Sequence, residues 1–484
     1  MSGGYRMSLP FIGRQNELEE LRGLFKQRTA SLVVIKGRRR IGKSRLAEEF
    51  AKDLQFYEFI GLFPKEDKAA KKINQRTEFV RQMKEQGMPG VSDQDWGDIF
   101  WQLSQHTQTG RTVILLDEIS WMAADEADFL PKLKNAWDRH FKKNPQLILI
   151  LCGSISTWID KNILSSTGFF GRISLELTLD ELSLSESNLF LEQVRFKRSV
   201  YEKFKILSIV GGIPWYLEQI RGDQSADANI KRLCFSKNGL LVKEFKKIFH
   251  DLFENRGELY QKIVRALLTG PTEFNTIAQK VQYKKSGRLS DYLDALIKAG
   301  FIVRDFTWGI KTDQMSTLSR YRLRDNYLRF YLKYILPHLS QIGQNKYQKT
   351  TLLALPGWDS IGGLQFENLV LNNREYIYDA LGLNVDEVSV DNPYFQRKTT
   401  KQLGCQIDYL IQTKYNTLFA CEIKFSREKI GANIIPKMQK KLDALALPRR
   451  YSCVPVLIHI NGVTDELVES DYFAALIDFS DFLK

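Results

Sequence analysis

Residues 31–44 read SLVVIKGRRRIGKS, and this stretch decides the fold of the N-terminal third of the chain. Its first half is a nearly continuous apolar run, which favours a strand buried on both faces of a parallel sheet. Its second half, from Gly37 to Ser44, matches G-x-x-x-x-G-K-[ST], and an amphipathic stretch follows. The order of strand, glycine-rich turn and helix predicts a loop that wraps a phosphate chain.

The residue types of this loop suggest individual roles toward ATP. Gly37 and Gly42 would let the backbone turn so that its N–H groups point inward, and the following helix N-terminus adds partial positive charge. Lys43 would reach the β- and γ-phosphates, and Ser44 would bind Mg²⁺.

Two further apolar runs end in polar residues. Residues 113–118 read VILLDE, so a buried strand would deliver Asp117 to Mg²⁺ and Glu118 to the attacking water. Residues 147–154 read LILILCGS, and Ser154 would contact the γ-phosphate or the water. Alone, an acidic pair after an apolar run is usually a strand end, and Gly-Ser is often a simple turn. The glycine-rich loop upstream favours the functional interpretation of the acidic pair.

The pattern of strands and helices predicts an α/β fold: a P-loop NTPase parallel sheet with a helical lid, a winged-helix domain and a C-terminal α/β domain. The resemblance described below implies that the C-terminal domain is restriction-endonuclease-like. Arg172, soon after the third run, is a candidate arginine finger in cis or in trans, although solvated arginines are commoner. The expected divisions are a core at 8–180, a lid at 181–256, a winged helix at 257–320 and a nuclease-like domain at 321–484.

The composition points to a basic globular protein. Lys+Arg number 70 against 57 Asp+Glu, a formal charge of +13, which favours a nucleic-acid partner, with DNA as the expected kind, over a merely solvated basic surface. The five cysteines are scattered, so we expect neither disulfides nor a zinc site. No signal-peptide core and no apolar run of membrane length is visible, which predicts a cytoplasmic protein with no membrane partner.

Residues 257–312 predict three short helices followed by a β pair, the pattern of a winged helix. A basic turn at the start of the third helix suits DNA phosphates; it contains Lys284, Lys285, Ser286 and Arg288. The alternative is a packing or regulatory module that does not contact DNA.

The C-terminal segment carries a second set of charged residues. Asp408 lies in an apolar strand at 405–411, and the next strand contains Glu422 and Lys424, which face the same side because they are two residues apart. Carboxylates embedded in apolar strands are costly unless they are paired or bind a metal, which argues against an ordinary solvated hairpin. Upstream, Glu367 lies on a predicted helix.

Two motifs resemble a known family. Residues 11–18, FIGRQNEL, look like the lead-in of signal-transduction ATPases with numerous domains (STAND) and of origin-recognition-like AAA+ relatives, and residues 210–217, VGGIPWYL, resemble their GxP motif. The resemblance implies that Arg14 and Pro214 lie near the base of ATP. The whole chain is similar to archaeal-type ATPases with a C-terminal nuclease-like domain.

The C-terminal segment itself resembles a PD-(D/E)xK nuclease core. The resemblance implies that Asp408 and Glu422, supported by Glu367, bind Mg²⁺ or Mn²⁺, and that Lys424 acts on the attacking water, with Gln439 positioning that lysine. Intact residues do not prove cleavage.

Three functions therefore stay open: an ATP-regulated nuclease, an ATPase switch whose nuclease fold only binds DNA or protein, and a motor or remodelling ATPase assembled as a ring, which would be a homo-oligomer.

Overall fold

The computed structural model describes residues 10–63, 74–124, 126–154, 156–253, 257–283, 287–347, 354–400 and 402–484. The chain divides into two compact units, Met1–Glu181 and Leu182–Lys484, and each is described by itself.

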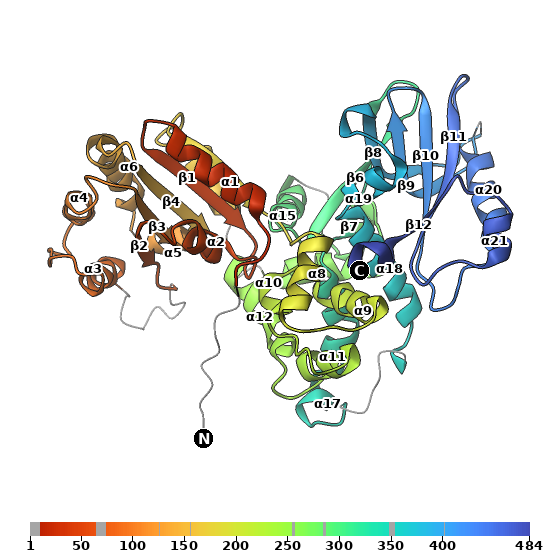
Figure 1. The fold of residues 1–484 in the computed structure, drawn as a ribbon, viewed down its shortest axis with the longest axis horizontal. Coiled ribbons are helices and arrows are strands. Elements are labelled where there is room, and N and C mark those ends of the chain that lie inside the picture. Colours follow the sequence, from red (N-terminus) through yellow and green to blue (C-terminus); the bar gives the residue numbers. More distant parts are fainter. Residues whose placement is uncertain are drawn as a thin grey trace. The chain divides into compact units, whose positions relative to one another are not determined.

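The described part of the first unit contains a five-stranded, wholly parallel sheet in the order β2-β3-β4-β1-β5 (Figure 1). The strands are β1 (Ser31–Gly37), β2 (Gln55–Ile60), β3 (Thr112–Asp117), β4 (Leu147–Gly153) and β5 (Ile173–Leu179). This confirms the predicted α/β fold of the P-loop type. The chain passes from β3 at Asp117 to β4, which lies between β3 and β1, and this order positions the site described below.

The three central strands are those that the apolar runs predicted. All six residues of β3 and all seven of β4 are buried. Helices cover the sheet, and a cluster of aromatic side chains fills one interface, with Phe59 stacked on Phe79 at 4.1 Å between ring centroids and Trp96 against Phe129 at 4.8 Å. The helices are α1 (Gln15–Gly23), α2 (Lys43–Phe50), α3 (Gln75–Glu85), α4 (Trp96–Gln105), α5 (Ile119–Met122), α6 (Phe129–Arg139) and α7 (Ser156–Ile159).

The outer edge of β2 is covered by glutamine side chains from α3 and its C-terminal cap. Each glutamine amide accepts a bond from a backbone N–H and donates one to the C=O of the same residue, as a neighbouring strand would. The pairs are Gln75 with Leu62, Gln82 with Ile60 and Gln86 with Glu58, at 2.7–3.0 Å. We call these three residues the glutamine ladder. Unpaired strand edges invite pairing with other chains, and the ladder removes that opportunity.

The second unit begins with helices and a β hairpin. Its helices in this part are α8 (Leu184–Gln193), α9 (Val200–Val210), α10 (Pro214–Leu217), α11 (Ala226–Cys234), α12 (Leu240–Phe253), α13 (Gly257–Ala266), α14 (Phe274–Lys280) and α15 (Gly287–Lys298). An antiparallel hairpin of β6 (Ile302–Gly309) and β7 (Gln314–Leu323) follows. Three helices and a hairpin thus occur where they were expected, while the winged-helix assignment stays a prediction. Lys284, Lys285 and Ser286 lie outside the described residues, and Arg288 is the second residue of α15.

A second sheet follows, and its described part has the order β12-β11-β10-β9-β8 (Figure 1). β9 pairs antiparallel with β8 and β10, whereas β10, β11 and β12 run parallel. Its strands are β8 (Val388–Gln396), β9 (Cys405–Thr413), β10 (Thr417–Lys424), β11 (Ser452–His459) and β12 (Ala475–Asp478), and the helices after β7 are α16 (Asn326–Phe330), α17 (Leu339–Gly343), α18 (Trp358–Leu371), α19 (Glu375–Leu381), α20 (Ile435–Ala444) and α21 (Asp465–Glu469).

No helix in the described ranges combines the length and the apolar character needed to cross a bilayer.

Replacing all three residues of the glutamine ladder by alanine tests its role. Each lost amide leaves a backbone N–H and C=O without their partner, and an unmade bond costs about 1–3 kcal/mol where water does not replace it. We expect a lower thermal midpoint and concentration-dependent aggregation, measured by calorimetry and light scattering. The control replaces Gln105 and Gln108, which bond each other at 2.8 Å, while Gln105 also donates to Ser104 Oγ at 3.4 Å and neither bond holds a strand edge. Equal behaviour of both variants would contradict the role assigned to the ladder.

Candidate functional site

The glycine-rich loop turns where glycine is required. Gly37 has φ +151°, and a Cβ there would lie 2.5 Å from the Leu179 carbonyl oxygen of β5. Gly42 has φ +93° and forms the N-cap of α2, which begins at Lys43. Any other side chain at Gly37 would push β1 and β5 apart, so the loop sequence and the sheet packing require the same residue.

Lys43 is buried, and its ammonium lies inside the loop. Nζ donates to the carbonyl oxygens of Gly37 at 3.1 Å and Arg38 at 3.2 Å, and to Ser154 Oγ at 3.1 Å. The ammonium is therefore held at the loop's centre by neutral oxygens.

The residues that follow β3 and β4 complete the arrangement. Ser44 Oγ donates to Asp117 Oδ2 at 2.5 Å. Ser154 Oγ donates to Glu118 Oε1 at 2.7 Å, and the Ser154 backbone N–H donates to the same carboxylate at 3.3 Å. Glu118 itself has φ +51°, a conformation that is uncommon for non-glycine residues and is concentrated at functional sites. Lys43, Ser154 and Glu118 thus form one continuous chain of hydrogen bonds.

The donor set fits a magnesium nucleotide. A hydroxyl and a carboxylate already in contact, Ser44 and Asp117, are the hard oxygen ligands that Mg²⁺ prefers, and Lys43 offers a cation to phosphate oxygens. Behind them, burial and then the Asp117 charge raise the pKa of the Cys152 thiol, so this cysteine is an inert part of the core.

The two residues predicted to lie near the base of ATP, Arg14 and Pro214, belong to different units. Arg14 is buried and donates to Glu17 Oε1 at 3.1 Å and to the backbone oxygen of Asp180, immediately after the β5 residue that pairs with Gly37. Arg14 therefore lies at the end of the strands from which the glycine-rich loop begins. Its contact with ATP stays a prediction. Pro214 is the first residue of α10 in the second unit.

Arg172 lies far from the glycine-rich loop along its own sheet. It precedes β5, whose first residue pairs with Leu32 at the start of β1, so it lies at the sheet edge opposite the loop, about 20 Å away along seven residues of strand. Its guanidinium holds both oxygens of Asp138, at 2.9 and 3.0 Å, and this bond lowers the pKa of Asp138 to about 2. The finger role of Arg172, in cis or in trans, stays a prediction.

The second unit brings Asp408 and Glu422 together. Lys441, on α20, bridges them: Nζ lies 3.3 Å from Asp408 Oδ1 and also bonds Glu422 Oε2. Asp408 Oδ2 accepts from the Ile423 backbone N–H at 3.1 Å. Burial opposes the charge on Lys441, but the two carboxylates raise its pKa above the ordinary range. Two carboxylates that converge on one cationic point suit a divalent ion, which would take the place of the ammonium.

The sequence interpretation did not identify Lys441. It assigned the lysine to Lys424, which is exposed at the last residue of β10, and that role stays a prediction. Gln439 instead bonds Asp443 at 2.7 Å and Tyr472 at 2.9 Å. Lys441 lies 33 positions after Asp408, on a separate helix, and this spacing belongs to no motif from which its role could be inferred. The sequence shows only that the helix is basic.

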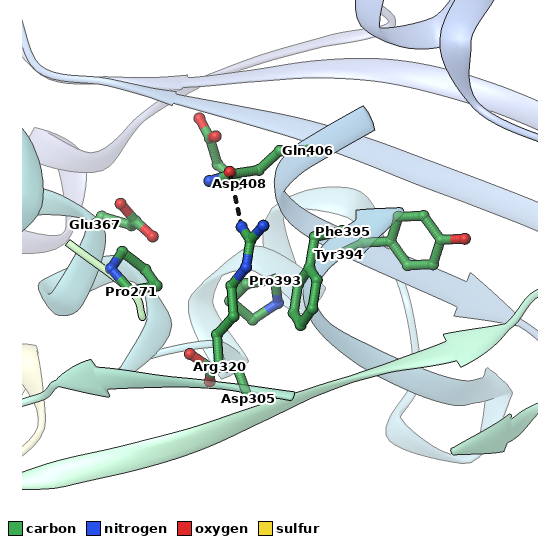
Figure 2. Close-up of a pocket in the computed structure, with 9 residues that line it drawn as sticks. All are labelled: Pro271, Asp305, Arg320, Glu367, Pro393, Tyr394, Phe395, Gln406 and Asp408. Atoms are coloured by element: carbon green, nitrogen blue, oxygen red, sulfur yellow. Dashed lines mark hydrogen bonds between the residues drawn. The ribbon is translucent and has the colours of Figure 1, made fainter. Parts of the chain in front are cut away.

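Glu367, on α18, shares a pocket with Asp408 (Figure 2). Burial, and then the Asp408 charge, raise the pKa of Glu367 to about 7. Within the described ranges, no three His, Cys, Asp or Glu side chains are grouped closely enough to hold a metal by themselves. An ion bound by Asp408 and Glu422 would therefore need oxygen atoms from water or substrate as further ligands.

Comparison with known proteins agrees with the geometry of the first unit. Residues 11–220 match the family model described as an ATPase domain predominantly from Archaea. The match spans 210 of 484 residues and contains the loop, Asp117, Glu118 and residues 210–217. The chain thus carries an ATPase domain of the archaeal type.

Individual relatives are distant. Over 339 residues the chain is 26% identical to an uncharacterized protein of Methanocaldococcus jannaschii, covering 69% of this chain and 70% of that protein. A solved Walker-type ATPase of Pyrococcus abyssi is 16% identical, covers 66% of this chain and 96% of its own, and has a TM-score of 0.49. The ORC2 protein of Aeropyrum pernix, in its ADPNP–ADP complexes, is 14% identical, with coverages of 71% and 97% and a TM-score of 0.41.

The raised pKa of Glu367 predicts a pH-dependent stability. Between the ordinary pKa of 4.5 and about 7, the unfolded chain loses this proton while the folded chain keeps it, so stability falls as pH rises across this window. In the wild type this loss amounts to up to about 3 kcal/mol in the free energy of unfolding. The Glu367→Gln variant has no carboxyl group at this position and should therefore lack the loss. We expect thermal midpoints of variant and wild type to coincide near pH 4.5 and the variant to be more stable at pH 8. The exposed Glu466→Gln serves as the control; a constant difference at all pH values would contradict the assignment.

Proposed function

We propose that the first unit binds and hydrolyses ATP with Mg²⁺, and that its nucleotide state controls the second unit. The observation that carries this proposal is the chain from Lys43 through Ser154 to Glu118, beside the contact between Ser44 and Asp117. It joins a phosphate-binding cation to a carboxylate that can act on water.

Each residue has a role in the proposed reaction. Lys43 exchanges its carbonyl partners for phosphate oxygens, and Ser44 and Asp117 hold the metal, which when bound neutralises charge on the phosphates. Glu118 orients the attacking water and accepts its proton. Ser154 holds the Glu118 carboxylate and is in contact with Lys43, so it can transmit the presence of the γ-phosphate to Glu118.

For the second unit, we propose metal-dependent hydrolysis of a nucleic-acid phosphodiester. Asp408 and Glu422 would hold Mg²⁺ or Mn²⁺, which supplies Lewis-acid polarisation of the phosphate. Lys441, displaced from the carboxylates, would remain close enough to stabilise the attacking water. The convergence of Lys441 on both carboxylates supports this candidate.

The same contact supports a second candidate, because an ion pair can close a site permanently. The chain would then be an ATPase switch that binds DNA or protein through an inactive nuclease fold. Both candidates keep the ATPase, and they differ in whether phosphodiester bonds are broken. Assembly into a homo-oligomer, with Arg172 acting in trans, is a further proposal that concentration-dependent ATPase measurements would test.

Glu118→Gln and Lys43→Ala test the ATPase. We expect Glu118→Gln to retain ATP binding and to lose hydrolysis by about 10²–10⁴-fold, because an amide cannot accept the proton. Lys43→Ala should weaken ATP binding itself. Phosphate release and binding of a fluorescent ATP analogue measure the two effects. Glu48→Gln, on the outside of α2, is the matched control. If Glu118→Gln hydrolysed ATP at the same rate as this control, the proposed role of Glu118 would be wrong.

Three variants test the phosphodiesterase: Lys441→Ala, Lys424→Ala and Asp408→Asn. Plasmid DNA and RNA are incubated with Mg²⁺ or Mn²⁺, with and without ATP, and products are separated on gels. We expect Asp408→Asn and Lys441→Ala to reduce cleavage at least about 100-fold, since metal or proton-transfer partners are lost. Lys440→Ala, the exposed neighbour on α20, is the control. Wild-type protein that never cuts leaves the switch as the function.

A further inference from the structure

The pocket at Asp408 and Glu367 is built from two parts of the second unit. The C-terminal sheet and α18 contribute Asp408, Glu367 and Phe395, and the β6–β7 hairpin contributes Asp305 and Arg320. Figure 2 shows the Arg320 side chain extending from β7 toward Gln406 and lying beside the Phe395 ring. The hairpin therefore forms a wall of the candidate phosphodiesterase site.

The hairpin is fixed against the sheet by buried polar contacts. Trp308 Nε1 donates to Gln412 Oε1 at 2.7 Å, and Gln412 Nε2 donates to the Ile310 carbonyl at 2.9 Å. Arg322 Nε donates to Asp305 Oδ2 at 2.9 Å, and Arg322 Nη1 donates to Asn368 Oδ1, on α18, at 2.5 Å. Buried groups of this kind are costly when they lose their partners, so the hairpin keeps one position on the sheet.

Arg320 is a half-buried cation held by neutral groups. Its guanidinium lies 4.3 Å from the Phe395 ring centroid, and Nη1 donates to Gln406 Oε1 at 3.0 Å. The nearby Glu273 carboxylate is engaged by Arg397, and over the described ranges Arg320 makes no ion pair. Burial lowers the pKa of Arg320 from the usual guanidinium range. Its remaining donors thus suit an anion, and a planar guanidinium binds phosphate oxygens through two parallel bonds.

We propose that Arg320 is the phosphate-binding residue of the C-terminal site and holds the phosphodiester of a nucleic acid beside Asp408 and Glu367. This inference rests on the proposed phosphodiesterase for its substrate class. It assigns half of the site to the hairpin: the carboxylates hold the metal, and the arginine of the preceding module holds the phosphate. Asp305 of the hairpin is already paired with Arg322, so the other carboxylates of the pocket lie on the sheet and α18 and its arginine on the hairpin, an arrangement that matches a phosphate with its metal ion.

Binding of fluorescein-labelled oligonucleotides tests the proposal without requiring cleavage. Single-stranded DNA, duplex DNA and RNA of equal length are titrated in Ca²⁺ and followed by fluorescence anisotropy. The variants are Arg320→Ala and Arg320→Gln, the second of which can still bond Gln406. We expect both to weaken binding of the preferred nucleic acid at least about tenfold and to reduce the salt slope by about one. Arg304→Ala, on the other strand of the hairpin, β6, and with its guanidinium 4.5 Å from the Phe306 ring centroid, should remain within about twofold of wild type.

The outcomes separate this inference from the proposed function. Arg320-dependent binding without cleavage refutes the phosphodiesterase and keeps the phosphate site. Cleavage that is equal in wild type, Arg320→Gln and Arg304→Ala overturns the phosphate site and keeps the phosphodiesterase, and binding that is equal in the three proteins overturns the phosphate site alone. The phosphate site is also overturned if wild-type protein does not bind nucleic acid, or if Arg320→Gln binds it more tightly than wild type. Unchanged ATPase rates and thermal midpoints of the variants show that they are folded.

Discussion

The insertion of β4 between β1 and β3 is the constraint on which the first unit depends. It places Ser154 between Lys43 and Glu118, so that one hydroxyl contacts both the phosphate-binding cation and the carboxylate that acts on water. With β1 and β3 adjacent, this contact could not form in the same way, because the two groups would meet directly and neutralise each other. The strand order therefore sets the electrostatics of the site as well as its shape.

Charge burial organises the second unit in a similar manner. Asp305 is paired with Arg322, and Lys441 with Asp408 and Glu422, as buried charges must be. Two half-buried groups are less well compensated, Glu367 with its raised pKa and Arg320 with its neutral partners, and both line one pocket. A pocket that leaves one charge of each sign to be satisfied is complementary to a ligand that carries both.

The apolar runs predicted the three central strands of the first sheet and β9 and β10 of the second, and none of the edge strands. β1, β3 and β4 are almost wholly buried, and their sequences are therefore nearly continuous in apolar residues. The missed strands β2, β5, β8 and β12 each lie at a sheet edge, where one side meets solvent or covering side chains and the apolar signal is diluted. The glutamine ladder could not be predicted either, because its role depends on the position of the β2 edge that it covers.

Features that depend on neighbours along the chain could be read locally: the glycine-rich loop, the helix that it opens, and the carboxylates that end or interrupt buried strands. Partnerships between distant segments could not, because hydrogen bonds and ion pairs form through space and leave no fixed spacing. Folding alone brought Lys441 to Asp408, placed Ser154 beside Glu118, and moved Arg172 to the far edge of its sheet. It also brought Arg320 from one module to the carboxylates of another, since the buried contacts of the hairpin determine where that arginine lies.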